Sequence, residues 1–245
     1  MSFPKTVFLK DGWEKQETSS QKHKLGTRGM TADGRVFYYA ENSGTAITRG
    51  GQVVDGIAAV GAHDMDLAAT ATSSGATSFT SGTSLTVTKD QYKDGYVYFN
   101  DGPAEGEVYR VKSNTAVSSA TGLKVTIDDE DGLVTALTTS SLFGLMYNPY
   151  KDVKIIDGDG TMTTGPLGVT CMPFTADYFG WVQVAGIATV AMDGTPAFGT
   201  LVGASSNHAG QFLAVGADTT PAVARVHGKA VVDNEYHTVM LMNLY

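Results

Sequence analysis

The pattern of apolar and polar positions in the last third of the chain predicts a series of short β-strands. Residues 178–186 combine aromatic and β-branched side chains with Gly and Gln, and further short apolar or alternating segments follow at 187–192, 200–202, 212–215, 222–226 and 238–244. Clusters of Asp, Asn, Gly, Pro and Ser separate these segments, as turns between strands do. We expect no helix between them. Closely spaced strands with such turns predict an antiparallel β-barrel or sandwich.

The same pattern begins earlier in the chain and is interrupted by a second unit. Residues 35–40 follow an Asp-Gly turn and predict a strand, whereas residues 68–82 are rich in Thr, Ser, Gly and Ala and predict a linker or loop. Residues 83–145 form a compact group of alternating segments. We therefore predict an all-β protein, an antiparallel β-barrel or sandwich with a second, smaller inserted β domain. The predicted parts are an extended N-terminal arm over 1–28, a main domain over 29–75 and 150–245, and the inserted domain over 76–149.

Charge is distributed unevenly along the chain. The 245 residues carry 17 Lys and Arg against 25 Asp and Glu, a formal charge of −8, which argues against nucleic acid as a partner. The first 35 residues hold seven basic and four acidic side chains, a balance of +3, so the remaining 210 have ten basic and 21 acidic ones, a balance of −11. A mildly basic start on an acidic body predicts an arm that contacts another molecule. The alternative is a solvated terminus without a partner.

Cysteine content and hydropathy restrict the compartment. Cys171 is the only cysteine, so an intramolecular disulfide and a cysteine-based metal site are excluded. The apolar character of residues 169–172 predicts that Cys171 is a small buried residue. The first residues lack the apolar segment of a secretion signal, and no stretch of about 18 apolar residues is present. We expect a soluble protein, made in a reducing compartment, that does not associate with a membrane.

Three acidic segments have some features of a metal site, and each has a simpler interpretation. Residues 63–66 contain one His and two Asp, a grouping that is more often a solvated loop. Residues 157–161 begin like a calcium loop, but the later Gly and Glu positions are not matched. The four acids at 128–131 are best explained as a solvated turn. No nucleophile elbow, phosphate loop or zinc motif is present. We therefore expect no metal, no cofactor, no catalytic residue and no enzymatic activity.

Several segments resemble virion structural proteins of tailed phages. The segments that carry this resemblance are 25–28 with 33–40, the pattern Tyr92-x-x-Gly95-Tyr96-Val97 with the following Tyr109-Arg110-Val111, 148–150, and the ending at 178–186 with 228–232. The ending resembles in particular the decoration (cement) proteins of phage heads.

The resemblance implies a protein that binds the outer surface of an icosahedral head and stabilises contacts between capsomers. Its implied partner is the major capsid protein, and its implied state is a homo-oligomer, with a trimer favoured. It would reside in the virion after assembly in the bacterial cytoplasm.

The candidate capsid interface lies in the basic N-terminal arm. We expect this arm to become ordered on binding, so that an aromatic side chain is buried and basic side chains face acidic groups of the shell. The candidate interface residues are Trp13, Lys15, Lys22, Lys24 and Arg28.

Two other functions stay open at this point. The chain could be another virion component, such as a head fibre, a tail protein or a host-glycan-binding protein. In that case Tyr92, Tyr96 and Tyr98 are candidates for stacking on a sugar, although alternate faces of one buried strand explain them better. A polysaccharide-degrading enzyme would need paired carboxylates from distant strands, which sequence alone does not identify.

Overall fold

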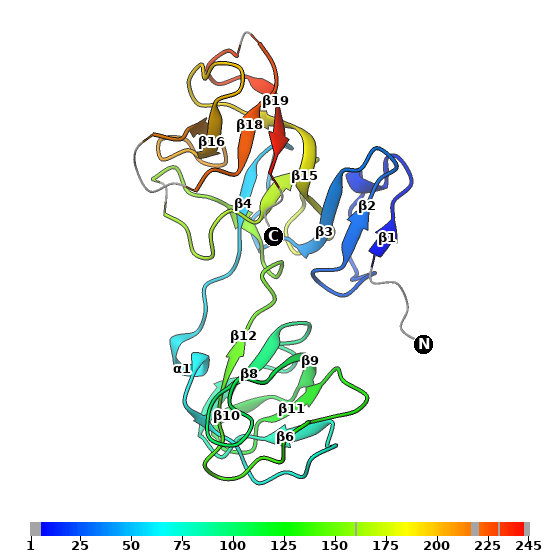
Figure 1. Ribbon diagram of the computed structural model, residues 1–245, viewed down its shortest axis with the longest axis vertical. Helices are drawn as coiled ribbons and strands as arrows, with labels where there is room; N and C mark the ends of the chain where they lie inside the picture. Colours follow the sequence, from blue (N-terminus) through cyan, green and yellow to red (C-terminus); the bar gives the residue numbers. More distant parts are fainter. Residues whose placement is uncertain (1–5, 160, 217–220, 230, 243–245) are drawn as a thin grey trace. The chain divides into compact units, whose positions relative to one another are not determined.

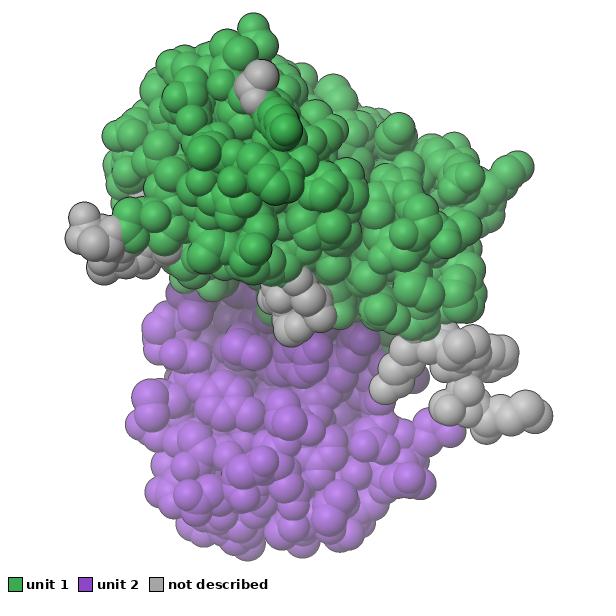
Figure 2. All heavy atoms as spheres, turned by 45° about the horizontal axis from the view of Figure 1, so that its top comes forward, with its two compact units in different colours: residues 1–57, 149–245 green, residues 58–148 purple. Residues whose placement is uncertain are grey.

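The computed structural model describes residues 6–159, 161–216, 221–229 and 231–242, and it confirms the predicted all-β class. The described chain forms two compact units (Figures 1 and 2). Unit 1 comprises residues 1–57 and 149–245, and unit 2 comprises residues 58–148. Unit 2 is thus inserted between the two segments that make up unit 1.

One sheet of eleven strands forms the framework of unit 1. Its main path runs in the order β1-β2-β3-β15-β19-β18-β16-β17, and β14 connects β15 to β4, which also pairs with β13. The strands of unit 1 are β1 (Thr6–Phe8), β2 (Arg28–Met30), β3 (Val36–Glu41), β4 (Val53–Asp55), β13 (Lys154–Ile155), β14 (Gly168–Thr170), β15 (Phe179–Ala191), β16 (Leu201–Ala204), β17 (Phe212–Ala214), β18 (Ala224–Val226) and β19 (Tyr236–Leu241), and a short 3₁₀ helix, η1, spans Trp13–Lys15.

The long strand β15 belongs to both halves of this sheet. Its first part pairs with β3 and β14, and its second part pairs with β19. A β-bulge interrupts the register between Gln183 and Ala185, and the next residue, Gly186, has a φ of +91°. Such a φ is readily adopted only by glycine. The bulge and this glycine bend the strand without ending it. The two strands predicted at 178–186 and 187–192 are therefore one continuous strand.

The alternation of side chains along β15 places successive residues in different cores. Trp181 packs with Leu9, Leu25 and Phe37 on one face, whereas Val182 joins a cluster on the opposite face. Beyond the bend, the sheet from β15 through β19, β18 and β16 curls until β17 meets the end of β15 in a parallel bridge between residues 192 and 212. The interior of this curled part is filled by Val, Ala, Leu, Met and Phe side chains.

Unit 2 is a second, closed β structure with its own core. Its six-stranded sheet has the order β5-β12-β8-β9-β11-β6, and a bridge between Ala69 and Ser81 joins the two edges. The core includes Phe79, Phe99 and Phe143. The strands are β5 (Leu67–Ala68), β6 (Ser78–Thr80), β7 (Leu85–Val87), β8 (Tyr96–Asp101), β9 (Val108–Asn114), β10 (Val117–Ala120), β11 (Lys124–Ile127) and β12 (Leu142–Met146), and the helix α1 spans Gly61–Asp64. Strands β7 and β10 form a separate pair.

The described part of the N-terminal segment is not an extended arm, contrary to our prediction. β1 pairs in parallel with β2, and Leu9 and Leu25 are buried. The peptide groups of Thr18 and Phe179 exchange two hydrogen bonds of 2.9 Å. The segment has few apolar residues, so its local pattern does not predict a strand. Its pairing depends in part on Phe179, which is more than 150 residues away in the chain. Residues 1–5 of the predicted arm, and residues 243–244 of the last predicted strand, lie outside the described residues.

The first domain boundary also differs from the prediction. The second unit begins at residue 58 and not at 76, because the predicted linker at 68–82 contains β6 and supplies Ala69 and Phe79 to the core. Its Thr, Ser and Gly content resembles that of a linker. The pairing of β6 with β11 nevertheless turns it into part of the closed sheet.

Candidate functional site

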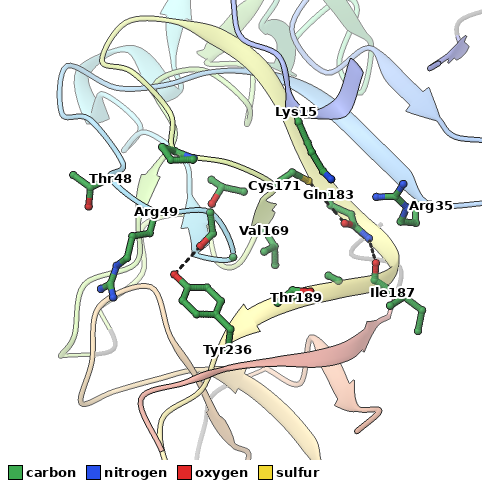
Figure 3. Close-up of a pocket in the computed structure, with 15 residues that line it drawn as sticks. Lys15, Arg35, Thr48, Arg49, Val169, Cys171, Gln183, Ile187, Thr189 and Tyr236 are labelled. Carbon is green, nitrogen blue, oxygen red and sulfur yellow. Dashed lines mark hydrogen bonds between the residues drawn. The ribbon is translucent and has the colours of Figure 1, made fainter. Parts of the chain in front are cut away.

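A pocket of about 560 Å³ lies in unit 1 beside the bend of β15 (Figure 3). It is bounded by η1, by the loop that precedes β4, by the end of β14, and by the second part of β15 with β19. Fifteen residues line it: Lys15, Arg35, Thr48, Arg49, Gly50, Gly51, Val169, Thr170, Cys171, Pro173, Gln183, Ile187, Ala188, Thr189 and Tyr236. Its volume lies within the range of about 300–1,000 Å³ that is typical of ligand sites.

The lining contains three basic side chains, Lys15, Arg35 and Arg49, and no Asp or Glu. Arg35 is already engaged: its Nε lies 2.7 Å from an Asp33 carboxylate oxygen, and its Nη2 lies 3.4 Å from the buried Glu14. Within the described part of the chain, Lys15 and Arg49 have no ion pair. Two cations are therefore available to an anionic ligand, although the chain as a whole is acidic.

Gln183 lines the pocket and bridges the bend of β15. Its side-chain amide donates to the carbonyl oxygens of Ala185 at 3.1 Å and Ile187 at 2.8 Å, across the bend of β15. The Cys171 thiol lies 3.9 Å from the Gln183 Oε1 atom. Burial, and secondarily the negative charge of Glu14, raises the pKa of Cys171 to about 12. The thiol is thus protonated at neutral pH and is a poor nucleophile. We predicted a small buried residue at this position, whereas Cys171 is partly buried and packs against the cluster that contains Trp181.

Tyr236 and Arg49 lie on the side of the pocket opposite to Lys15 and Arg35 (Figure 3). The Tyr236 hydroxyl donates to the Gly50 carbonyl at 3.0 Å, which fixes the ring at the rim. The two available cations therefore lie on opposite sides of the opening.

Only one predicted interface residue, Lys15, lines this pocket. Trp13 precedes it on η1 and is 48% exposed, Lys22 and Lys24 are exposed in the following loop, and Arg28 is half-buried on β2. Sequence reasoning missed Arg35, Arg49, Gln183 and Tyr236, which come from separate segments. No local motif could have indicated them.

A second surface feature is an exposed apolar row on the outer face of the curled sheet. Ile187 on β15 is opposite Met240 on β19, Met240 is opposite Arg225 on β18, and Arg225 is opposite Leu201 on β16. Directly opposed residues share a face of a sheet. The three large apolar side chains are 39–40% exposed. Phe198, which is 61% exposed, lies 6.2 Å from the His227 ring next to this face. We call Ile187, Met240, Leu201 and Arg225 the apolar row.

The acidic segments considered for metal binding use their side chains in other ways. The His63 ring lies 2.6 Å from the Tyr92 hydroxyl, and Asp66 accepts from the Asn100 amide at 2.7 Å. Asp159 accepts from the Thr161 N–H at 2.8 Å, which lowers the pKa of its carboxyl. The acids at 128–131 are exposed. Among the described residues, no three His, Cys, Asp or Glu side chains form a group that could hold a metal ion.

A Ser, an Asp and a His meet near the end of β15 without the connectivity of a catalytic triad. The Ser205 hydroxyl donates to the Asp193 carboxylate, and the His208 ring lies 3.3 Å from the other oxygen of the same carboxylate. In a triad the histidine would accept the hydroxyl proton. The Ser205 oxygen also accepts from the N–H groups of Asn207 and His208, so this cluster shapes a turn.

The three tyrosines considered for sugar stacking do not form one surface. Tyr92 is 1% exposed and packs against Tyr147 in the core of unit 2. Tyr96 and Tyr98 are half-buried on β8, where Val97 and Phe99 face the interior.

No helix among the described residues has the length and apolar character needed to cross a membrane. The chain matches no protein-family model, no curated protein and no solved structure.

Proposed function

We propose that this chain is a decoration protein of a tailed-phage head, which binds the outer surface of the capsid and stabilises contacts between capsomers. The apolar row is the observation that carries the proposal. An antiparallel sheet commonly presents polar side chains on its solvated face. Here Ile187 lies beside Met240, and Leu201 follows beyond Arg225. Large apolar side chains grouped on such a face are typical of a surface that binds another protein.

The apolar row is suited to a weak contact that is repeated many times over a shell. Covering a side chain such as Met240 or Leu201, which is already partly buried, contributes about 1 kcal/mol. A single copy would therefore bind weakly through the row. Copies linked in a homo-oligomer, for which we favour a trimer, would bind far more tightly because the second and third contacts become intramolecular.

The N-terminal layer supplies a second region suited to contact. β1 is an edge strand that pairs with β2, and Phe8 on it is 73% exposed. An edge strand offers backbone groups for pairing with another chain. Trp13, Lys15, Lys22, Lys24 and Arg28 remain the proposed contacts in this layer. Since residues 6–28 are already folded onto unit 1, these side chains would bind without a disorder-to-order transition.

The test is occupancy on capsids. Particles assembled from a major capsid protein encoded in the same genome are incubated with the purified chain, and bound protein is quantified after sedimentation. The double variant Met240→Asp with Leu201→Asp is expected to lower occupancy at least tenfold, because two charges would be desolvated at the contact. The matched control, Ser206→Asp, changes an exposed loop position of the same unit and is expected to bind normally.

Two outcomes would overturn the proposal. One is absence of the wild-type chain from mature particles and from the incubated capsids. The other is binding to tail structures or host glycans in place of the capsid, which would favour the alternative of another virion component.

A further inference from the structure

We propose that the pocket beside the bend of β15 binds an extended, acidic peptide segment of the protein to which the chain attaches. This inference rests on the proposed function only in naming the source of the segment. Three features of the pocket carry it: its charge, a strand edge that faces it, and its apolar floor.

The charge of the pocket selects an anionic ligand. Lys15 and Arg49 are the cations whose charges are not already paired, and no carboxylate lines the pocket. They lie on opposite sides of it (Figure 3). A phosphate ion is typically held by several donors that converge on one point. Two separated cations are better suited to two carboxylates spaced along an extended chain.

One edge of β15 faces the pocket. In an antiparallel pair, residues whose peptide groups bond to the partner alternate with residues whose peptide groups point away. The Met192 N–H donates to the Glu235 carbonyl at 3.0 Å, and the Met192 carbonyl accepts from the Asn234 N–H at 2.9 Å. In this part of β15, the peptide groups of the even-numbered residues therefore point toward β19. The peptide groups of Ile187 and Thr189 therefore point away from β19, toward the pocket.

The edge is closed at both ends, and Gly51 also lies against its middle, where a Cβ atom on Gly51 would be 2.7 Å from the Thr189 carbonyl oxygen. The Gln183 amide donates to the Ile187 carbonyl at 2.8 Å, and the Ala191 N–H donates to the Gly51 carbonyl at 3.1 Å. The Thr189 N–H lies between these two bonds, at a residue that lines the pocket. A carbonyl oxygen of an extended peptide can accept a hydrogen bond from this N–H, as in peptides that bind along the edge of a strand.

The floor favours a peptide over a purely ionic ligand. Val169, Pro173 and Ala188 line the pocket, so apolar side chains of a bound peptide would find apolar contacts there. Alternation of acidic and apolar residues in an extended segment would direct acids toward the cations and apolar groups toward the floor.

The experiment uses the full chain and a fluorescent peptide of alternating Glu and Val, with capped ends. Binding is measured by fluorescence anisotropy at low and high NaCl. We expect saturable binding that weakens with salt. We expect Lys15→Ala and Arg49→Ala each to weaken it about two- to fivefold, as for exposed ion pairs. Lys89→Ala, an exposed site in unit 2, is the control and should bind like wild type.

The peptide inference is overturned if a Gln-Val peptide binds equally, if the two pocket variants bind like wild type, or if inorganic phosphate competes at the concentrations at which the peptide binds. The outcome is separable from that of the capsid test. Normal capsid occupancy without peptide binding overturns only the peptide inference. Peptide binding that depends on Lys15 and Arg49, in a chain that does not bind capsids, overturns only the proposed source.

Discussion

His63 shows how a residue with the chemistry of a metal ligand serves packing instead. Its side chain is 5% exposed, and its ring donates to or accepts from the Tyr92 hydroxyl at 2.6 Å. Burial disfavours the charged imidazolium and so lowers the pKa of His63 below its usual value near 6.5. A buried histidine that must remain neutral makes stability dependent on pH.

We predict that unit 2 loses stability as the pH falls below about 6.5. The unfolded chain then binds a proton that folded His63 does not, so the free energy of unfolding decreases by up to about 1.4 kcal/mol per pH unit until the folded pKa is reached. Urea unfolding at pH 7.5 and pH 5.5, followed by the protection of the backbone amides of unit 2 in hydrogen exchange, measures this. The variant His63→Gln should lose most of the pH dependence of unit 2, whereas His227→Gln, at an exposed site, should keep it. Equal slopes in both variants would contradict the prediction.

At the scale of elements, the bend of β15 decides how unit 1 is built. The bulge before Gly186 lets one strand pair with β3 and β14 before the bend and with β19 after it. Without the bend, β15 would continue beside β3. It would then not reach β19, and the curled part of the sheet would lose the strand that also lines the pocket. A Cβ atom on Gly186 would lie 3.1 Å from Arg35 Cγ and 3.2 Å from Arg35 Cα.

We predict that Gly186→Ala destabilises unit 1 more than Gly165→Ala does. Both glycines have a φ of +91°, but a Cβ on Gly165 would meet nothing within 4 Å. The Gly165 variant should therefore report backbone strain alone, about 1–3 kcal/mol, and the Gly186 variant should add the contact with Arg35. Urea unfolding followed by Trp fluorescence measures unit 1, because Trp13 and Trp181 both belong to it. Equal effects would show that the backbone of Arg35 moves away without cost.

At the scale of the whole molecule, two separate cores support two units. Unit 2 has a closed sheet around Phe79, Phe99 and Phe143, and unit 1 has its own clusters, one of which includes Val190. Each unit buries its apolar side chains among its own residues. A compact unit with its own core is expected to unfold cooperatively by itself.

We predict that the two units unfold independently. Phe143→Ala should destabilise unit 2 by about 3–5 kcal/mol, because it leaves a cavity at a fully buried site, without moving the Trp fluorescence transition of unit 1. Val190 is also fully buried, and Val190→Ala should destabilise unit 1 without changing the transition of unit 2. Unit 2 is monitored by protection of its backbone amides in hydrogen exchange. A shift of both transitions in either variant would indicate one cooperative structure.

Much of the fold could be predicted from local pattern, and the site could not. The alternating segments within residues 83–145 predicted strands, and β8 and β11 are strands of that region. The segment at 68–82 failed because its short strand β6 is stabilised by pairing with β11, not by its own composition. Of the pocket, only Lys15 was a candidate, since charge density along the chain detects a basic segment but not cations that meet from distant segments.

The sequence by itself determined the all-β class, the existence of an inserted unit and the uneven charge, because strand alternation, turn residues and composition are local properties. Tertiary structure alone decided that the N-terminal segment joins the sheet, that β15 bends, and that Lys15, Arg49 and Thr189 line one pocket. These features depend on backbone pairing and packing between residues far apart in the chain, and such contacts leave no periodic signal in the segments that make them.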